Sequence, residues 1–312
     1  MGTPRTERFG RFELLEQMGM GSLFMRHQAL ATEAPAGSRP VVLTRLSPGL
    51  TEDPAVVEEF LDLASLSARL QHENVVRVLD FGMADGEPFL VREWAEGQDL
   101  GWVQVMLRRR GMWTLPEPIV VSIGMDICQG LQPAHPHVGL VHGELSPSNV
   151  LMGNGGEVKL LEFGFNRWTL RKAWAKWSVG VMGIKLKYFA PEQLLDAPVD
   201  GRADVYVLGV LLYTLLCGDL HVRSDFDGNT VRDVMEGRLI PARQRNPSLD
   251  AELVRILERA LARSVDDRYP SAEAMGQALA AWLKAHAPTF SRETRKQWLA
   301  SVLPPATPQR SS

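Results

Sequence analysis

Three side chains that could move protons or bind a divalent cation follow one another near the middle of the sequence. They are Glu144, Asn149 and Glu162. Carboxylates transfer protons, and carboxylate and amide oxygens are ligands for hard cations. Two short apolar runs between Asn149 and Glu162, Val150–Met152 and Val158–Leu161, predict a pair of strands that would hold these groups in place.

The composition is that of an ordinary globular protein. Of 312 residues, 45% are hydrophobic and 23% are charged, which excludes a mainly disordered chain. The 34 Lys and Arg nearly balance the 37 Asp and Glu, so the formal charge of −3 gives no general case for nucleic acid binding. The only cysteines, Cys128 and Cys217, cannot form a disulfide framework or a four-cysteine zinc site. The sequence shows no signal-like start and no run of 18 apolar residues. We therefore expect a cytoplasmic protein with no membrane span.

The elements that must position these side chains change in kind near residue 97. The first part predicts strands and one helix that begins near Pro54 and ends near Leu70. The strands expected there are Phe12–Met18, Leu23–Ala31, Val41–Leu46, Val75–Phe81 and Pro88–Trp94. Helical spacing then covers Pro116–Ala134, Ala203–Cys217, Leu249–Ala262 and Ser271–Ala285. The sequence therefore predicts an α+β chain with a β-rich lobe at 9–95, a helical lobe at 96–285, a helical extension at 286–303 and a disordered tail at 304–312.

The order and spacing of several motifs resemble the protein kinase family. The run from His142 to Asn149 is similar to the catalytic loop H-R-D-L-x-x-x-N, and Glu162-Phe163-Gly164 stands where the family has D-F-G. The A-P-E motif is present at 190–192. The resemblance extends from about Phe9 to Leu283 and is greatest to bacterial Ser/Thr kinases of the eukaryotic type. It implies a bilobal kinase-like fold in which the structural positions are His142, Phe163, Gly164, Glu192, Asp204 and Arg268.

The chain departs from the family at the ion pair that positions the nucleotide phosphates. The resemblance places the family's lysine at Thr44 and its partner glutamate at Leu63. Joint loss of both charges is physically reasonable, because one alone would be buried without compensation. Arg45 follows Thr44, but strand alternation turns it to the opposite face. Glu59, one helical turn before Leu63, could replace the glutamate but has no lysine to pair with. We therefore expect a cleft without the positive charge that a triphosphate needs.

The two catalytic carboxylates are also altered. The resemblance gives Glu144 the position of the catalytic aspartate and Glu162 that of the magnesium aspartate, while Asn149 matches the second metal ligand. Each glutamate is longer by one methylene, and a displacement of about 1 Å can lower a rate about 100-fold. We therefore expect a pseudokinase with little or no phosphotransfer, which acts as a protein-binding regulator or scaffold in bacterial signalling.

Two alternatives remain open. One is an active Ser/Thr kinase that uses Glu144 as the base, with Glu162 and Asn149 holding magnesium. The other is a nucleotide-sensing switch that binds ATP with weak or no magnesium and does not catalyse. No cofactor is otherwise expected.

The nucleotide pocket implied by the resemblance is altered as well. Its positions are Gly19, Gly21, Leu23, Val42, Thr44, Arg92, Glu93 and Leu151. The glycine-rich loop keeps two glycines and is incomplete in either alignment. Val42 is larger than the usual alanine, and Arg92 stands at a gatekeeper position that is normally apolar. Since a buried guanidinium needs a carboxylate, we hypothesise that Arg92 fills the back pocket, pairs with Glu162 or Glu59 and excludes ATP. A strand register shifted by one residue would instead let Arg92 extend to solvent.

A basic, tryptophan-rich segment lies between Glu162 and Glu192. The partner surface expected there comprises Trp168, Arg171, Lys172, Trp174, Lys176 and Trp177. Its apolar residues follow helical spacing. Such a helix could dock on its own lobe and block the cleft, bind an acidic protein partner or, on weaker grounds, contact a membrane surface. Gly143 replaces the arginine that in the family contacts a phosphate on this segment. The sequence leaves the oligomeric state open.

Overall fold

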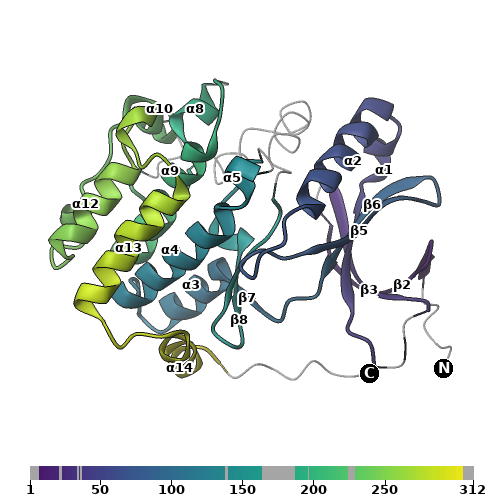
Figure 1. Cartoon of the computed structure of the whole chain (residues 1–312), viewed down its shortest axis with the longest axis horizontal. Helices are drawn as coiled ribbons and strands as arrows, with labels where there is room; N and C mark the ends of the chain where they lie inside the picture. Colours follow the sequence, from purple (N-terminus) through teal and green to yellow (C-terminus); the bar gives the residue numbers. More distant parts are fainter. Residues whose placement is uncertain are drawn as a thin grey trace.

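The computed structural model describes residues 7–20, 23–33, 35, 37–137, 140–163, 187–195, 197–223 and 229–304. Gly21, Gly164, the predicted partner surface at 168–177 and most of the predicted tail lie outside these residues. Within them, Figure 1 shows a strand-rich lobe beside a larger helical lobe, as the sequence predicts.

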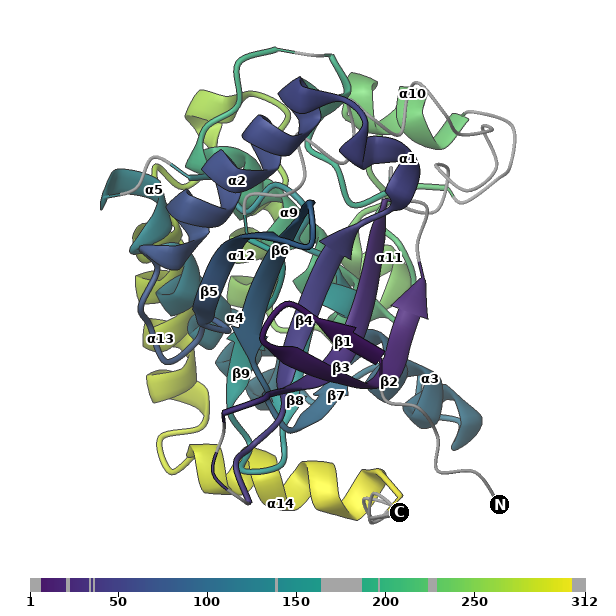
Figure 2. The same ribbon diagram turned by 90° about the vertical axis from the view of Figure 1, so that its right-hand side faces the viewer.

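A six-stranded antiparallel sheet forms the first lobe, with the strand order β1-β2-β3-β4-β6-β5. The strands are β1 (Glu7–Phe9), β2 (Phe12–Met20), β3 (Phe24–Ala31), β4 (Val41–Leu46), β5 (Val78–Ala84) and β6 (Glu87–Glu93). Helices α1 (Pro48–Thr51) and α2 (Pro54–Ala68) follow β4, and Figure 2 shows α2 alongside the sheet. Asp53 caps α2 by accepting a hydrogen bond from the amide of Ala55, and Phe60 and Ala64 of α2 are buried in the lobe's core.

One strand begins later than its sequence predicts. The expected strand Val75–Phe81 is β5, Val78–Ala84, and Val75 instead forms an isolated bridge with Leu160 of the second lobe. Val75 and Val76 therefore join the lobes, because the amide of Val76 also donates to the carbonyl of Leu160 at 2.9 Å.

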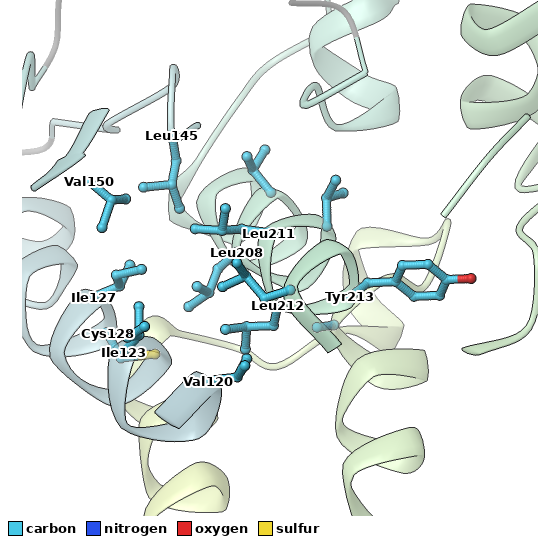
Figure 3. Close-up of a cluster of buried hydrophobic side chains, with 14 of the residues drawn as sticks. Val120, Ile123, Ile127, Cys128, Leu145, Val150, Leu208, Leu211, Leu212 and Tyr213 are labelled. Atoms are coloured by element: carbon cyan, nitrogen blue, oxygen red, sulfur yellow. The ribbon is translucent and has the colours of Figure 1, made fainter. Parts of the chain in front are cut away.

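The second lobe is built around α9 (Gly201–Cys217), in which every residue from Ala203 to Cys217 is buried. The other helices of the lobe include α3 (Leu100–Arg109), α4 (Glu117–Leu131), α5 (Ala134–His137), α8 (Pro191–Leu194), α10 (Asn229–Glu236), α11 (Ala242–Arg245), α12 (Ala251–Ala260) and α13 (Ala272–His286), and of these α4, α11, α12 and α13 pack against α9. Figure 3 shows Leu208, Leu211 and Leu212 of α9 beside Ile123 and Ile127 of α4. A helix that is apolar on all sides belongs in the centre of a core, and that is where α9 lies.

A small sheet lies where the lobes meet. It consists of β7 (Gly97–Asp99), β8 (Val150–Gly153) and β9 (Val158–Leu160), in that order. The strands predicted at 150–152 and 158–161 are β8 and β9, and they place Asn149 at the start of one strand and Glu162 just past the end of the other.

The C-terminal extension forms α14 (Arg292–Val302), which begins after the N-cap Ser291. Leu299 and Val302 are buried against the second lobe. Arg295 is 2% exposed, and its Nε donates to the carbonyl of Gly156 at 2.7 Å. The same guanidinium donates to Ser122 Oγ at 3.1 Å and pairs with Asp126 of α4. The extension is thus part of the second lobe's core.

The two cysteines and the length of the helices also bear on what the chain can do. Cys128 and Cys217 are buried, and burial raises the pKa of both thiols, that of Cys217 to about 12, so neither forms a reactive thiolate readily. Among the described helices, none has both the length and the apolar character needed to cross a bilayer.

Candidate functional site

Asp204 of α9 holds the loop that carries Glu144. Its carboxylate is fully buried and accepts hydrogen bonds from the amides of His142 and Gly143, each at 2.8 Å. His135 Nε2 lies 2.8 Å from the same carboxylate. Burial alone would raise the pKa of Asp204, but His135, the ring of His142 and the amide of Gly143 keep it below its usual value. Asp204 therefore joins α9 to the loop that carries Glu144.

No motif in the sequence indicates the contribution of His135. Its partner lies in another helix, so no local pattern reveals the contact. One signal does exist in the chain: a Cβ added at Gly201 would lie 2.3 Å from His135 Nδ1. The glycine at the start of α9 thus provides the space that the imidazole occupies.

Arg268 and Glu192 form a buried, two-pronged ion pair. Nη1 and Nη2 of Arg268 donate to the two carboxylate oxygens of Glu192 at 2.7 and 2.8 Å. The guanidinium also donates to the carbonyls of Ala262, Arg202 and Arg263. This pair anchors α8, which follows the tryptophan-rich segment, to the second lobe, and it agrees with the structural positions assigned to both residues.

The catalytic-loop and D-F-G-like motifs are joined by direct contacts. Asn149 Nδ2 donates to the carbonyl of Glu144 at 2.8 Å, and the amide of Leu161 donates to the carbonyl of Asn149 at 3.0 Å. The ring of His142 lies 4.6 Å from that of Phe163, as expected for a packing residue. The structure thus brings Glu144, Asn149 and the residues before Glu162 into one site.

Glu162 is held by two arginines from the first lobe. Its Oε1 lies 3.2 Å from Nη1 of Arg92 and 3.3 Å from Nη2 of Arg26. The Arg92 side chain is 6% exposed, so the hypothesis that it is buried against Glu162 agrees with the structure, and the alternative that it extends to solvent is wrong. We call these three residues the Arg26–Glu162–Arg92 cluster.

The expectation that the cleft lacks positive charge beside Glu162 is wrong, because Arg26 lies there. In the antiparallel sheet Arg26 pairs with Thr44, and Val42 pairs with Arg92. Paired residues face the same side of a sheet, so Arg26, Thr44 and Arg92 share one face. The cation lost at Thr44 is therefore partly replaced from the neighbouring strand, which a motif comparison along the chain does not detect.

The charge balance of this cluster decides how it can bind ions. Burial by itself would raise the pKa of Glu162, but Arg92 and Arg26 outweigh burial and keep the pKa below its usual value. The carboxylate is therefore ionised and already balanced by cations. Glu162 also has a φ of 61°, a left-handed conformation that is uncommon for residues other than glycine and that clusters at functional sites.

Magnesium does not fit this donor set as it is arranged. Two unit charges 4 Å apart interact by about 4 kcal/mol at an effective dielectric constant of 20. A magnesium ion at Glu162 carries two positive charges and would be repelled by both guanidinium groups. The total repulsion would therefore be several times this value. The geometry therefore favours a carboxylate that holds arginines over one that binds a metal.

The other positions of the implied nucleotide pocket lie either on the strands next to Arg26 and Arg92 or at a separate cavity. Thr44 is 2% exposed, Leu23 and Leu151 are buried, and Gly19 pairs with Arg26 between β2 and β3. Glu93 Oε1 instead accepts from Lys159 Nζ at 2.6 Å. Glu93, Trp94, Leu151 and Lys159 line a cavity of about 320 Å³ that includes no member of the Arg26–Glu162–Arg92 cluster.

Comparisons with known proteins agree with this architecture. A sequence model described as the protein kinase domain matches residues 51–280. Tyrosine-protein kinase MasK of Myxococcus xanthus is 34% identical over 293 residues, covering 91% of this chain and 44% of the relative. Serine/threonine-protein kinase Pkn1 of the same species is 33% identical over 302 residues, covering 94% and 41%. The crystal structure of the PknI kinase domain of Mycobacterium tuberculosis superposes with a TM-score of 0.67 at 25% identity, covering 90% of this chain and 99% of that one. The chain spans less than half the length of these two curated relatives.

Proposed function

Because the chain belongs to the protein kinase family, we propose that it is a kinase homologue with little or no phosphotransfer activity that acts as a protein-binding regulator in bacterial signalling. The proposal places it in the cytoplasm. The kinase scaffold is kept: Asp204 holds the catalytic loop, and Arg268 holds Glu192. A regulator needs this scaffold to present its surfaces.

The observation that carries the proposal is the engagement of Glu162 by Arg92 and Arg26. In phosphoryl transfer the protein positions the phosphates and neutralises their charge with metal ions. Here the carboxylate at the metal position holds two guanidinium groups, and Thr44 supplies no charge at the lysine position. To bind magnesium, Glu162 would have to release Arg92, leaving a buried guanidinium without its carboxylate, which is strongly unfavourable.

A radiolabel transfer assay tests this proposal. With ATP and either magnesium or manganese, we expect no transfer from the wild-type chain to itself or to a generic substrate protein. A variant restored toward the family pattern, with Thr44→Lys, Leu63→Glu, Arg92→Met, Glu144→Asp and Glu162→Asp, is the comparison and is expected to gain magnesium-dependent ATP binding. Saturable transfer by the wild type that Glu162→Ala abolishes would establish the active-kinase alternative instead.

The tryptophan-rich surface at 168–177 is the proposed contact with a protein partner. Three tryptophans among three basic residues match the composition of interaction hot spots, which favour Trp and Arg. We expect the double substitution Trp174→Ala/Trp177→Ala to remove a specific set of proteins from an affinity capture quantified by mass spectrometry. Trp113→Ala is the matched control, since Trp113 is 63% exposed on the loop between α3 and α4. Equal recovery by wild type and double variant would exclude this surface as the contact.

A further inference from the structure

Two carboxylates and a histidine come together where α12 begins and α13 ends. One ring nitrogen of His286 and one carboxylate oxygen of each of Asp250 and Glu252 lie within 4.8 Å of one another. We propose that these three side chains bind a zinc ion, at a site separate from the cleft between the lobes. Figure 1 shows α12 and α13 on the side of the second lobe that faces away from the first lobe. The inference does not depend on whether the chain transfers phosphate.

The ring of His286 is held with one nitrogen close to Asp250. Its Nδ1 lies 3.0 Å from the carbonyl oxygen of Trp282, and since a carbonyl can only accept, Nδ1 carries a proton. In the neutral ring Nε2 then has a free electron pair, and it lies 3.8 Å from Asp250 Oδ2. The ring also stacks on the Trp282 indole, with 4.5 Å between the centroids and 12° between the planes. The imidazole is therefore already oriented as metal-binding histidines are, with its other N–H donating to a backbone carbonyl.

The carboxylate of Asp250 has one oxygen occupied by the protein and one available to a ligand. Its Oδ1 accepts from the amides of Glu252 and Leu253 at 2.9 and 3.1 Å, and from Trp282 Nε1 at 2.8 Å. Its Oδ2 accepts no hydrogen bond within the described residues, and 3.8 Å to His286 Nε2 is too far for one. Trp282 thus orients both ligands, the carboxylate through its indole N–H and the imidazole through its carbonyl.

Glu252 provides the second carboxylate and sets the charge of the site. Its side chain is half-buried, and among the described residues its carboxylate forms no hydrogen bond or ion pair. With a neutral imidazole, the two carboxylates carry two negative charges, which one divalent cation balances. If His286 were instead protonated and paired with Asp250, the charge of Glu252 would remain without a counter-ion. The charge balance therefore favours a metal ion over a simple ion pair.

The donor set is typical of zinc. Bonds from zinc to nitrogen and oxygen are about 2.0–2.2 Å long, so donor atoms in a tetrahedral site are about 3.4 Å apart. The separation of 3.8 Å between His286 Nε2 and Asp250 Oδ2 is close to this value, and small rotations of the Glu252 side chain would complete the set. Imidazole favours zinc, whereas magnesium and calcium prefer six or more oxygens. Three protein ligands leave the fourth position to water, and the 40% exposure of His286 lets the ion enter from solvent.

Isothermal titration of the whole, tag-free chain with zinc chloride at neutral pH tests the site. We expect one zinc ion to bind with a Kd on the order of 10 μM or tighter. His286→Gln and Glu252→Gln each remove one ligand and are expected to weaken binding at least about tenfold. His72→Gln and Glu258→Gln are the matched controls and should bind like the wild type. His72 is a half-buried histidine whose Nδ1 accepts from a backbone amide, and Glu258 is an exposed glutamate on the same helix as Glu252.

Thermal unfolding provides a second measurement. His286 is the last residue of α13 and Asp250 is the N-cap of α12, so a zinc ion would fasten the two helices together in the folded chain. Zinc at about 100 times its Kd should raise the Tm by about 3–6 °C, because a ligand of the folded state adds to its stability. This increase should be absent in Glu252→Gln and present in Glu258→Gln.

Three results would overturn the zinc site. If the wild type bound no zinc, His286 and Asp250 would form only an ion pair. If Glu252→Gln and a folded His286→Gln variant bound zinc as tightly as the wild type, these side chains would not be its ligands. If all four variants lost affinity equally, or none did, zinc would be bound adventitiously by other histidines. None of these results concerns phosphotransfer, which the radiolabel assay measures, so the zinc site and the proposed function are tested separately.

Discussion

Replacing Arg268 with methionine is expected to lower the free energy of unfolding by about 4 kcal/mol. The Arg268 side chain is fully buried and forms two hydrogen bonds with Glu192 and three with backbone carbonyls. Methionine fills similar volume but leaves the buried Glu192 carboxylate and three carbonyls without these donors. Removing one partner of a buried pair costs about 3–5 kcal/mol, much more than the pair itself contributes.

Urea denaturation followed by circular dichroism measures this effect. The control is Arg202→Met, because Arg202 also pairs with two carboxylates, those of Asp200 and Asp266. Its side chain is 31% exposed, however, and both of its partners are more exposed than that. Exposed ion pairs contribute about 0–1 kcal/mol, so the control should change little. If the two variants lost equal stability, the Arg268–Glu192 pair would not be an anchor of the second lobe.

Replacing Arg295 with methionine is expected to cost about 3 kcal/mol and to release α14 from the second lobe. Arg295 joins α14 to Asp126 and Ser122 of α4 and to the carbonyl of Gly156 between β8 and β9. In this variant the carboxyl group of Asp126 stays mostly buried but loses the guanidinium that is its counter-ion. Limited proteolysis should then cleave near residues 287–291, before α14, faster than in the wild type.

The pH dependence of the Arg295→Met variant follows from Asp126. Burial raises the pKa of Asp126 by more than Arg295 lowers it, so Asp126 binds a proton more readily in the folded state than in the unfolded chain. A carboxyl of this kind adds stability below its ordinary pKa of 3.8, and that stability is lost as the pH rises through the folded-state value. Removing Arg295 raises that value further, so the variant should lose more stability at neutral pH than in acid. Arg232→Met is the control, since Arg232 is 64% exposed and pairs with Glu236, away from Asp126. If the loss of stability in the variant did not change with pH, Asp126 would not be its cause.

Local patterns in the sequence were sufficient to predict most elements of the fold. The helix at α2 has a capping aspartate followed by proline, and the apolar run at α9 could only be a buried helix. The same holds for the pairing of Arg92: a guanidinium at an inward position of a strand must find a carboxylate, and Glu162 was one of two within reach. Here the physical cost of an unpaired charge makes the prediction possible.

Contacts that depend on the relative placement of distant segments could not be predicted in this way. Arg26 reaches Glu162 because β3 and β4 pair in one particular register, and His135 reaches Asp204 across 69 positions of sequence. Neither residue belongs to a motif. The strand expected at 75–81 shifted to Val78–Ala84 because Val75 and Val76 contact Leu160 in the other lobe. The tryptophan-rich helix at 168–177 remains a prediction, as it lies outside the described residues.

The docking of α14 bears on where the folding unit ends. The kinase-domain match stops at residue 280, inside α13, before Trp282, which is 1% exposed and donates from Nε1 to Asp250 at 2.8 Å. A truncation at that boundary would discard both this indole and the guanidinium that compensates Asp126. The smallest autonomous unit therefore extends to about Val302, and shortened versions for crystallisation or screening should retain it.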